Sequence, residues 1–264
     1  MLSAREETVL FLSGLLHTQR QQRGTRNGRR ALSCFAHAVL VLRWFLDGTR
    51  VAQLAADNAI GGSTAYRYLH EGIDVLAAHQ PSLHSALLAA KAAGYSHVNL
   101  DGILIATDRV AAPGPTPGVD LWWSGKHHQH GGNIQVISAL DGWPLRTSDV
   151  RPGREHDTTC ARIHGLLPVL ANAAELPCLA DLGYEGEAAT VRVPIKKPTH
   201  GQLTNDQKTV NLIHAHLRSQ AERANSLLKT TFKALRRVSL CPWRIGATVA
   251  AALVLLHDEH GRTT

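Results

Sequence analysis

The segment from Leu212 to Lys229 constrains the chain most, because as an α-helix it separates into an apolar and a polar side. At 100° per residue, the polar side gathers Arg218, Glu222, Asn225 and Lys229 within an arc of roughly 60°. A carboxylate flanked by an arginine and a lysine suits an acid that binds a metal while its neighbours hold phosphate. The same spacing fits a solvated amphipathic helix with an ion pair between residues four apart. The helix alone does not choose between the two interpretations.

The first part of the chain is rich in arginine. Residues 1–95 contain ten Lys and Arg against six Asp and Glu, within a net charge of +7 for the 264 residues. Five arginines and no acid fall between Thr18 and Arg30, which we expect to form a loop or an arm that contacts phosphate. This composition favours a polyanionic partner. The candidate DNA contacts in this segment are Arg20, Arg23 and Arg26.

Residues 49–78 have the pattern of a helix, a short glycine turn and a capped helix. Gly61 and Gly62 separate a short helix from a second one, which we expect Ser63 to cap and which runs to about residue 78. This is the helix-turn-helix pattern, although an ordinary helical hairpin has the same spacing. In the first two turns of the second helix, the side chains expected to meet bases and phosphates are Thr64, Tyr66, Arg67 and His70.

From Tyr95 onward, strands alternate with helices. Runs rich in β-branched and apolar residues predict strands at 97–106, 133–139, 144–150, 176–180 and 191–195, and the first three are expected to be adjacent and antiparallel. Helices are expected at 156–170, 212–229 and 243–257. This organisation predicts an α/β domain over residues 95–264, preceded by an all-α helix-turn-helix domain over residues 1–94.

Three acids fall on separate elements of the α/β domain: Asp101 within a strand, Asp181 directly after another, and Glu222 on the long helix. A carboxylate buried within a strand needs a partner, and a bound cation is one. Open α/β sheets bind ligands at the carboxyl ends of strands, where Asp181 stands. Asp101 on an exposed edge strand and Asp181 in a turn are the alternatives. Converging carboxylates would suit Mg²⁺, or Mn²⁺ in its place, and phosphodiester chemistry.

Several short motifs carry a resemblance to a known family. They are Asp101-Gly102, Ser124-Gly125-Lys126-His127, Pro152-Gly153 with His156-Asp157, Ala180-Asp181 with Gly183-Tyr184, and Glu222-Arg223-Ala224-Asn225. With them the chain resembles, over nearly its whole length, DDE transposases of the bacterial insertion-sequence type, in the branch related to the Harbinger transposases. The resemblance implies a ribonuclease-H-like catalytic domain in which Asp101, Asp181 and Glu222 bind the metal ions.

Many such transposases share a signature of Tyr, two residues, Arg, three residues, Glu, six residues and Lys. Arg218, Glu222 and Lys229 match it, whereas Ala215 stands at the tyrosine position. This departure concerns any role of that tyrosine at the DNA end, and it leaves the metal chemistry intact. Together with Lys126, the polar residues of the helix expected to contact DNA are Arg218, Asn225 and Lys229.

Two further aspartates and a histidine cluster carry alternative interpretations. Asp108 is an alternative to Asp101 as the first acid, and Asp157 is expected to be a structural residue at a helix N-terminus. The histidines that follow Lys126, at 127–130, have no zinc-ligand spacing, so we expect this segment to lie near DNA phosphate instead.

These observations predict a DNA transposase that binds terminal inverted repeats, cleaves DNA by two-metal catalysis and joins the 3′-hydroxyl ends to target DNA. The expected partner is double-stranded DNA, with at least a dimer needed to hold two ends. A catalytically silent DNA-binding regulator and a Mg²⁺-dependent nuclease without strand transfer are the alternatives. Four cysteines without metal-ligand spacing, and the lack of an apolar run long enough to cross a bilayer, predict a reduced, cytoplasmic protein.

Overall fold

The computed structural model describes residues 4–26, 28–173, 175–187 and 189–264, and its contacts divide the chain into two compact units. The first unit contains Met1–Gln80, Leu228–Val238 and Ala247–Thr263, and the second contains Pro81–Leu227 and Ser239–Gly246. The chain therefore passes from one unit to the other within two of its helices, α8 (Asn205–Thr231) and α9 (Ile245–His260). The domain boundary near residue 94 stays a prediction.

The first unit is helical. Its N-terminal part contains α1 (Glu6–Gln22), α2 (Cys34–Asp47), α3 (Val51–Asp57) and α4 (Gly62–Ala77), and its later segments add η2 (Lys233–Leu235) and most of α9. Ser33 caps α2 by accepting a hydrogen bond from the backbone of Ala36, and Gly48 ends this helix in the left-handed conformation with φ 66°. Apolar side chains from α2 and α4 form the centre of the unit, and Phe45 packs edge-on against Phe232.

Helix α1 extends into the segment after Thr18 that was expected to be a loop or an arm. It continues to Gln22, so Arg20 lies within the helix and not in a loop. There its guanidinium donates to the carbonyl of Leu32 at 3.0 Å and lies 3.3 Å from Nδ1 of His37. The predicted loop is therefore wrong over residues 18–22, because Gln and Arg have high helix propensities and extend a helix that is already packed.

Two helices flank a short turn where the helix-turn-helix pattern was expected. Helix α4 begins at Gly62 with Gly61 as its N-cap, and no side chain caps it, so the predicted cap at Ser63 is wrong. Ala59, in the left-handed region with φ 51°, helps to make the turn from α3. On α4, the close approach to α2 occurs at Gly72, where an added Cβ would lie 2.4 Å from Cγ2 of Val41.

The second unit is built around one sheet with strand order β2-β3-β1-β6, to which β4 and β5 are added by pairing with β3. The strands are β1 (Val98–Ala106), β2 (Trp123–Ser124), β3 (Gln129–Ser138), β4 (Pro144–Thr147), β5 (Arg151–Pro152) and β6 (Cys178–Leu179). Strand β3 pairs antiparallel with both β1 and β4, which confirms the predicted group of three adjacent antiparallel strands. Strand β6 is parallel to β1.

Two predicted elements of this unit are different in the structure. The helix expected at 156–170 is divided into α6 (Asp157–Ile163) and α7 (Leu166–Asn172), because Gly165 takes the left-handed conformation with φ 62°. The strand expected at 191–195 is only an isolated bridge between Arg192 and Leu179. Pro194 has no amide hydrogen to extend that ladder.

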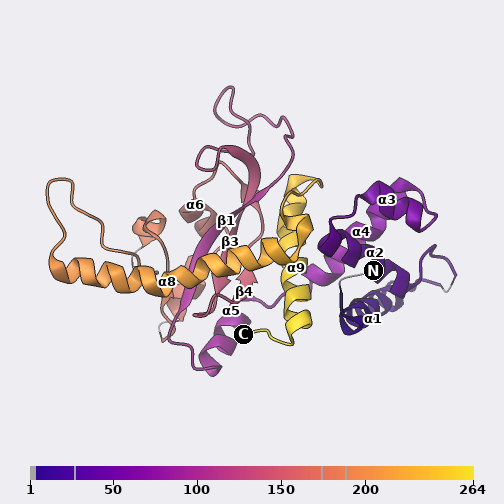
Figure 1. The fold of residues 1–264 in the computed structure, drawn as a ribbon, viewed down its shortest axis with the longest axis horizontal. Helices are drawn as coiled ribbons and strands as arrows, with labels where there is room; N and C mark the ends of the chain where they lie inside the picture. The colour runs from indigo at the N-terminus through magenta and orange to yellow at the C-terminus, as the bar shows by residue number, and fades with distance from the viewer. Residues whose placement is uncertain (1–3, 27, 174, 188) are drawn as a thin grey trace. The chain divides into compact units, whose positions relative to one another are not determined.

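Helices cover both faces of β1. The side chain of Asp101 accepts hydrogen bonds from α8, which crosses the sheet over β1 and β3 (Figure 1). The next residue, Gly102, lies against Asp157 of α6. Because successive residues of a strand face opposite sides, α8 and α6 lie on opposite faces of the sheet. The unit is completed by α5 (Leu83–Ala92), η1 (Leu182–Glu187) and η3 (Pro242–Arg244).

The second unit is thus a mixed α/β structure, consistent with the predicted ribonuclease-H-like class. Its core consists of the apolar residues of β1 and β3, among them Leu100, Ile105, Ile134 and Val136, all fully or almost fully buried. Within the part of the chain that the structure describes, none of the helices has the length and apolar character needed to cross a membrane.

At two glycines in helix interiors, replacement by alanine is expected to have opposite effects on the free energy of unfolding. Gly72→Ala should lower the free energy of unfolding by about 1–2 kcal/mol, because the stiff Val41 side chain blocks the added methyl group. Gly14→Ala in α1 should raise it by about 0.5–1 kcal/mol, because no described atom lies within 4 Å and alanine favours the helix. Urea denaturation followed by circular dichroism measures both, and equal shifts in the two variants would contradict the packing at Gly72.

Candidate functional site

The parallel pairing of β1 and β6 places two of the predicted acids on neighbouring segments of the chain. Asn99 of β1 pairs with Leu179 of β6. Asp101 and Asp181 each lie two positions beyond this last pair, on neighbouring segments. Asp181 lies two residues after the end of β6, and its Oδ1 accepts a hydrogen bond from the amide of Gly183 in its own turn at 2.9 Å.

Asp101 is held by two residues of α8. Its Oδ2 accepts a hydrogen bond from Asn225 Nδ2 at 2.8 Å, and its Oδ1 accepts from Arg218 Nη2 at 3.3 Å. Only 18% of the Asp101 side chain is exposed. Burial raises the pKa of this carboxyl from 3.8 to about 6, the negative charges of Asp181 and Asp157 raise it as well, and Arg218 opposes the rise. The three aspartates are therefore close enough to interact electrostatically.

Asp157 belongs to a second polar system, on the other face of β1. It is the first residue of α6, and its Oδ1 accepts from Asn133 Nδ2 at 2.7 Å while its Oδ2 lies 3.4 Å from Lys126 Nζ. Asn133 Oδ1 in turn accepts from Gln135 Nε2 at 2.9 Å, and the hydroxyl of Tyr184 donates to Gln135. This chain of hydrogen bonds links Asp157 to the segment that follows Asp181.

The sequence analysis did not identify Asn133 or Gln135 as part of the site. Both are buried, Gln135 completely, and they alternate with apolar residues along β3. Two amides on one side of an otherwise apolar strand were the available signal, because buried polar side chains need hydrogen-bond partners. Tyr184, which was part of a quoted motif without an assigned role, is also fully buried.

Glu222 lies on the side of α8 that meets Asp101, but its carboxylate does not form a cluster with the aspartates among the described residues. It lies on α8 four residues after Arg218 and three before Asn225, which places it on the side of the helix that meets Asp101. Its side chain is exposed. Throughout residues 4–26, 28–173, 175–187 and 189–264, no group of three or more His, Cys, Asp or Glu side chains is arranged to hold a metal ion. Asp108, the alternative first acid, is exposed beyond the end of β1.

A cavity of about 710 Å³ opens beside two of the aspartates, and Asp101 is not part of its lining. Asp157 and Asp181 line it, together with Gly102, and Lys126 lies at its edge with 67% of its side chain exposed. Arg154 and His127 also contribute to the wall. The cavity thus presents carboxylates and cationic side chains together, an arrangement that suits a phosphate group and a divalent cation.

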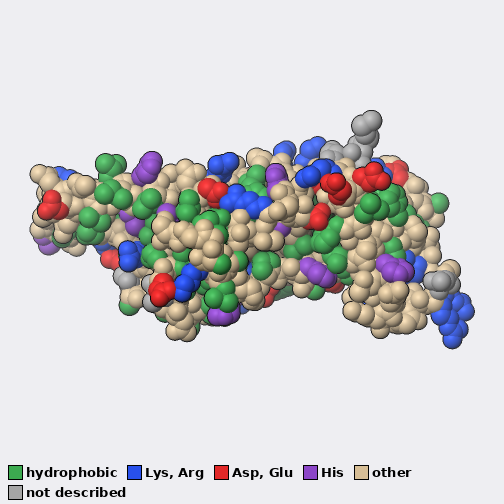
Figure 2. All heavy atoms as spheres, turned by 90° about the horizontal axis from the view of Figure 1, so that it is seen from below, with side chains coloured by type: hydrophobic (Ala, Val, Ile, Leu, Met, Phe, Trp, Pro, Cys, Tyr) green, Lys and Arg blue, Asp and Glu red, His purple; other side chains and the backbone are tan. Residues whose placement is uncertain are grey.

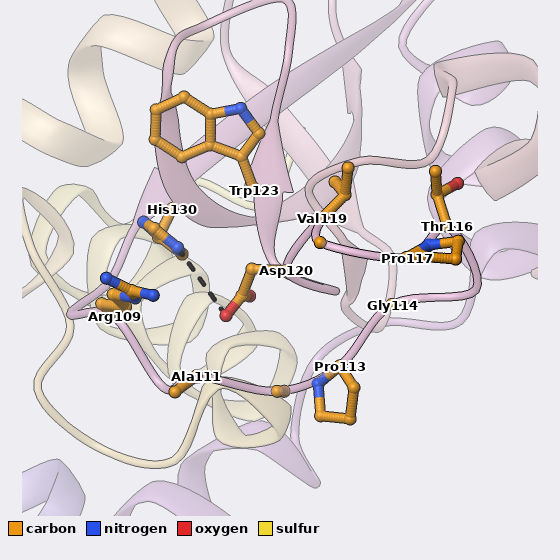
Figure 3. A pocket seen from close by; sticks show the side chains of 12 residues that line it. Arg109, Ala111, Pro113, Gly114, Thr116, Pro117, Val119, Asp120, Trp123 and His130 are labelled. Carbon is orange, nitrogen blue, oxygen red and sulfur yellow. Dashed lines mark ion pairs between the residues drawn. The ribbon is translucent and has the colours of Figure 1, made fainter.

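A neighbouring cavity of about 510 Å³ lies in the loop between β1 and β2, and Figure 3 shows its lining. His130 lies 3.8 Å from Asp120 and packs edge-on against Trp123. Arg109 also lines this cavity. The predicted histidine segment therefore contributes to two different cavities, His127 to the first and His130 to the second.

The predicted DNA contacts of the first unit lie in different environments. Tyr66 and Arg67 are exposed on α4, where Tyr66 stacks on His70 and Arg67 Nη2 donates to Thr64 Oγ1 at 3.2 Å. Of the three arginines upstream, Arg20 is bonded within the unit as described above, whereas the other two are exposed.

Charge pairing limits the free positive charge near the arginine-rich segment. Arg23 lies 3.5 Å from Glu71 of α4, and Arg30 pairs with the same carboxylate and stacks over the ring of Tyr68. Arg26 is exposed. On the face shown in Figure 2, basic and acidic side chains likewise lie next to one another in several places. Lys229 is half-buried within the first unit, and burial lowers the pKa of its ammonium group.

The raised pKa of Asp101 predicts a pH-dependent stability. The stability that this group contributes is fully present below its unfolded pKa of 3.8 and is lost as the pH rises through the folded value of about 6. We expect the free energy of unfolding of the metal-free protein, relative to Asp101→Asn, to fall by on the order of 2 kcal/mol between pH 4 and pH 7. Denaturant titrations of both proteins at the two pH values measure this difference, and identical pH dependence would contradict it.

Comparisons with known proteins agree with the motifs. A family model described as DDE superfamily endonuclease matches residues 100–257. No curated protein matches the chain. A solved structure, "Mos1 transposase paired-end complex with left transposon end", aligns with 92% of this chain and 85% of that chain at 11% identity and a TM-score of 0.22, which is too low to support an argument. Because the family model spans more than half of the chain and includes Asp101, Asp181 and Glu222, the protein belongs to the DDE superfamily endonucleases.

Proposed function

We propose that this protein is a DNA transposase that binds the terminal inverted repeats of an element, cuts the DNA at its ends and joins the 3′-hydroxyl groups to target DNA. Its family implies a metal-dependent nuclease. The observation that carries the proposal is the arrangement around Asp101. Asp181 lies on the segment that follows the parallel partner of β1, and α8 carries Glu222 on the same side as Arg218 and Asn225, which bond to Asp101.

The residues present fit a divalent metal. The candidate donors are carboxylate oxygens, which suit Mg²⁺ and Mn²⁺, and the negative charges of Asp181 and Asp157 raise the pKa of the largely buried Asp101. We propose that Asp101 and Asp181 hold the cation and that Glu222 joins them from α8. A bound divalent cation supplies activation of a water or a 3′-hydroxyl and stabilisation of the leaving oxygen.

The residues around the carboxylates would bind and orient the DNA. Lys126 and Arg154, at the edge of the cavity that contains Asp181, would hold the backbone phosphates on either side of the bond that is cut. In the first unit, Tyr66 and Arg67 are exposed on α4, the second helix of the predicted helix-turn-helix, and would contact the inverted repeat together with Arg26. Two DNA ends require at least two copies of the chain.

Cleavage of the flanking inverted repeats tests the enzymatic proposal. With Mg²⁺ or Mn²⁺ and oligonucleotides that carry these repeats, the wild-type protein should nick the ends and join them to a second duplex, as resolved on denaturing gels. Glu222→Gln should bind the same DNA but lose more than about 100-fold in cleavage rate, because a candidate metal-binding carboxylate is removed. Glu185→Gln, at a surface acid bonded to Lys196, is the matched control and should cut normally.

The outcomes separate three functions. If the wild-type protein binds the ends but does not cut them, as expected for Glu222→Gln, the enzymatic proposal is wrong. That result would identify a DNA-binding regulator. Nicking without joining would identify a metal-dependent nuclease that lacks strand transfer.

The salt dependence of DNA binding tests the role of Arg67. Arg67→Ala should make the plot of log binding constant against log salt concentration less steep by about 0.9, because one phosphate contact is lost. Arg43→Ala removes the same charge from a side chain that is already paired with Asp57 at 2.6 Å, and it should leave the slope unchanged. Fluorescence anisotropy over a range of salt concentrations measures the slopes. A wild-type slope for Arg67→Ala would remove α4 from the predicted DNA surface.

A further inference from the structure

We propose that Asn225 is a positioning residue for the metal site, which fixes helix α8 to strand β1 and orients the carboxylate of Asp101, and that it is not a DNA contact. The inference rests on the proposed function, because it assumes that Asp101 and Glu222 serve one site. Its starting point is the hydrogen bond from Asn225 Nδ2 to Asp101 Oδ2 at 2.8 Å.

The orientation of the Asn225 amide is set by Asp101. The amide group directs its nitrogen at the carboxylate, and its own oxygen is left buried with no hydrogen-bond partner among the described residues. Rotating the amide by half a turn would place that oxygen 2.8 Å from a carboxylate oxygen, where the two negative partial charges repel. An unsatisfied buried acceptor is unfavourable, so the contact with Asp101 outweighs the hydrogen bond that the amide oxygen lacks.

Asn225 and Arg218 together engage both oxygens of the carboxylate. They are seven residues apart, which places them on one side of α8 two turns from each other. Asn225 takes Oδ2 and Arg218 takes Oδ1. A carboxylate held at both oxygens cannot rotate freely about its Cβ–Cγ bond, so the lone pairs that these donors do not use have fixed directions.

The same two bonds fix the position of Glu222. It lies between Arg218 and Asn225 on the helix, so any slide or rotation of α8 that moved Glu222 would also break the contacts with Asp101. The contact of Asn225 is the shorter of the two, and it comes from a short side chain with few rotamers. Arg218 reaches Asp101 through a long, flexible side chain at 3.3 Å. Asn225 is therefore the residue that sets the register between helix and strand.

This role limits what the amide can offer to DNA. One of the two N–H bonds of the Asn225 side chain is directed at Asp101, and the amide oxygen is buried. A phosphate group accepts hydrogen bonds and offers none, so it cannot bond to the amide oxygen, and the affinity for DNA tests the second N–H.

Metal binding by the full-length protein, measured without DNA, tests the proposal directly. The probe is Mn²⁺ alone, and the electron paramagnetic resonance signal of the free ion reports how much is bound. Asn225→Leu keeps a similar side-chain volume but removes the donor, and Asn225→Ala is the second variant. Each is expected to weaken Mn²⁺ affinity by at least about 10-fold, the range for residues that orient metal ligands.

Asn211→Ala is the matched control on the same helix. The Asn211 side chain bonds to the backbone amide and carbonyl of Ile195 at 2.8 and 2.9 Å, so its removal breaks two hydrogen bonds away from Asp101. Its Mn²⁺ affinity should stay within about twofold of wild type, as expected for a residue outside the metal site. With the inverted-repeat DNA, the Asn225 variants should have a lower rate at saturating DNA and an unchanged affinity for DNA, which a DNA contact would not produce.

Asp101→Asn separates failure of this inference from failure of the proposed function. If Asp101→Asn binds Mn²⁺ as the wild-type protein does, the proposed metal site fails. If Asp101→Asn loses Mn²⁺ while both Asn225 variants bind it normally, only the positioning role is overturned. Loss of the folded circular dichroism spectrum in both Asn225 variants, with Asn211→Ala folded, would assign Asn225 to stability and would also overturn the proposal.

Discussion

The candidate site depends on one contact between a strand and a helix. Asp101 is largely buried in the middle of β1, and a buried carboxylate is unfavourable unless hydrogen bonds or opposite charge compensate for the lost water. Helix α8 supplies both, through Asn225 and Arg218. Because these donors lie on the stripe that carries Glu222, the contact that compensates the buried charge also sets where the third acid stands. Stability and the geometry of the site are thus coupled through the same two bonds.

The opposite face of β1 carries a second polar system, and Gly102 makes it possible. A side chain at this position would collide with Asp157, since an added Cβ would lie 2.2 Å from its Oδ1. With glycine there, the carboxylate of Asp157 approaches the strand and is anchored through Asn133 and Gln135 to Tyr184. Polar networks of this kind are stabilising only when their members are bonded to one another. The network joins the start of α6 to the segment after Asp181, and so holds together two walls of the cavity.

Net charge alone is a poor guide to the surface that DNA would meet. Of the arginines in the first unit, Arg20 donates to a backbone carbonyl, and Arg23 and Arg43 lie against carboxylates. The charges of Arg23 and Arg43 are compensated within the unit, so these two residues add little to long-range attraction, and the guanidinium of Arg20 is engaged in an internal hydrogen bond. The exposed side chains of Arg67 and Arg26 contribute more to the proposed interface. The structure therefore identifies a few exposed arginines, instead of the net charge of the chain, as the candidate DNA contacts.

The sequence by itself determined the class of the second unit and the three acids to consider, because alternation of apolar residues and short motifs are local properties of the chain. It placed Asp101 on a strand and Glu222 on a long helix, as the structure has them, and it expected Asp181 directly after a strand, whereas β6 ends two residues before it, at Leu179. Prediction from the sequence failed where backbone geometry overrode the apolar pattern. Gly165 divides a predicted helix, and Pro194 prevents a predicted strand from pairing.

Only the tertiary structure decided which side chains meet. The partnership of Asn225 with Asp101 joins residues 124 positions apart, and the link from Tyr184 to Gln135 spans 49. Neither could be predicted from helical or strand periodicity, because periodicity gives the side of an element on which a residue lies and not the partner that packs against it. The helix from Leu212 to Lys229 shows the difference: its stripe was visible in the sequence, and the carboxylate that it holds was not.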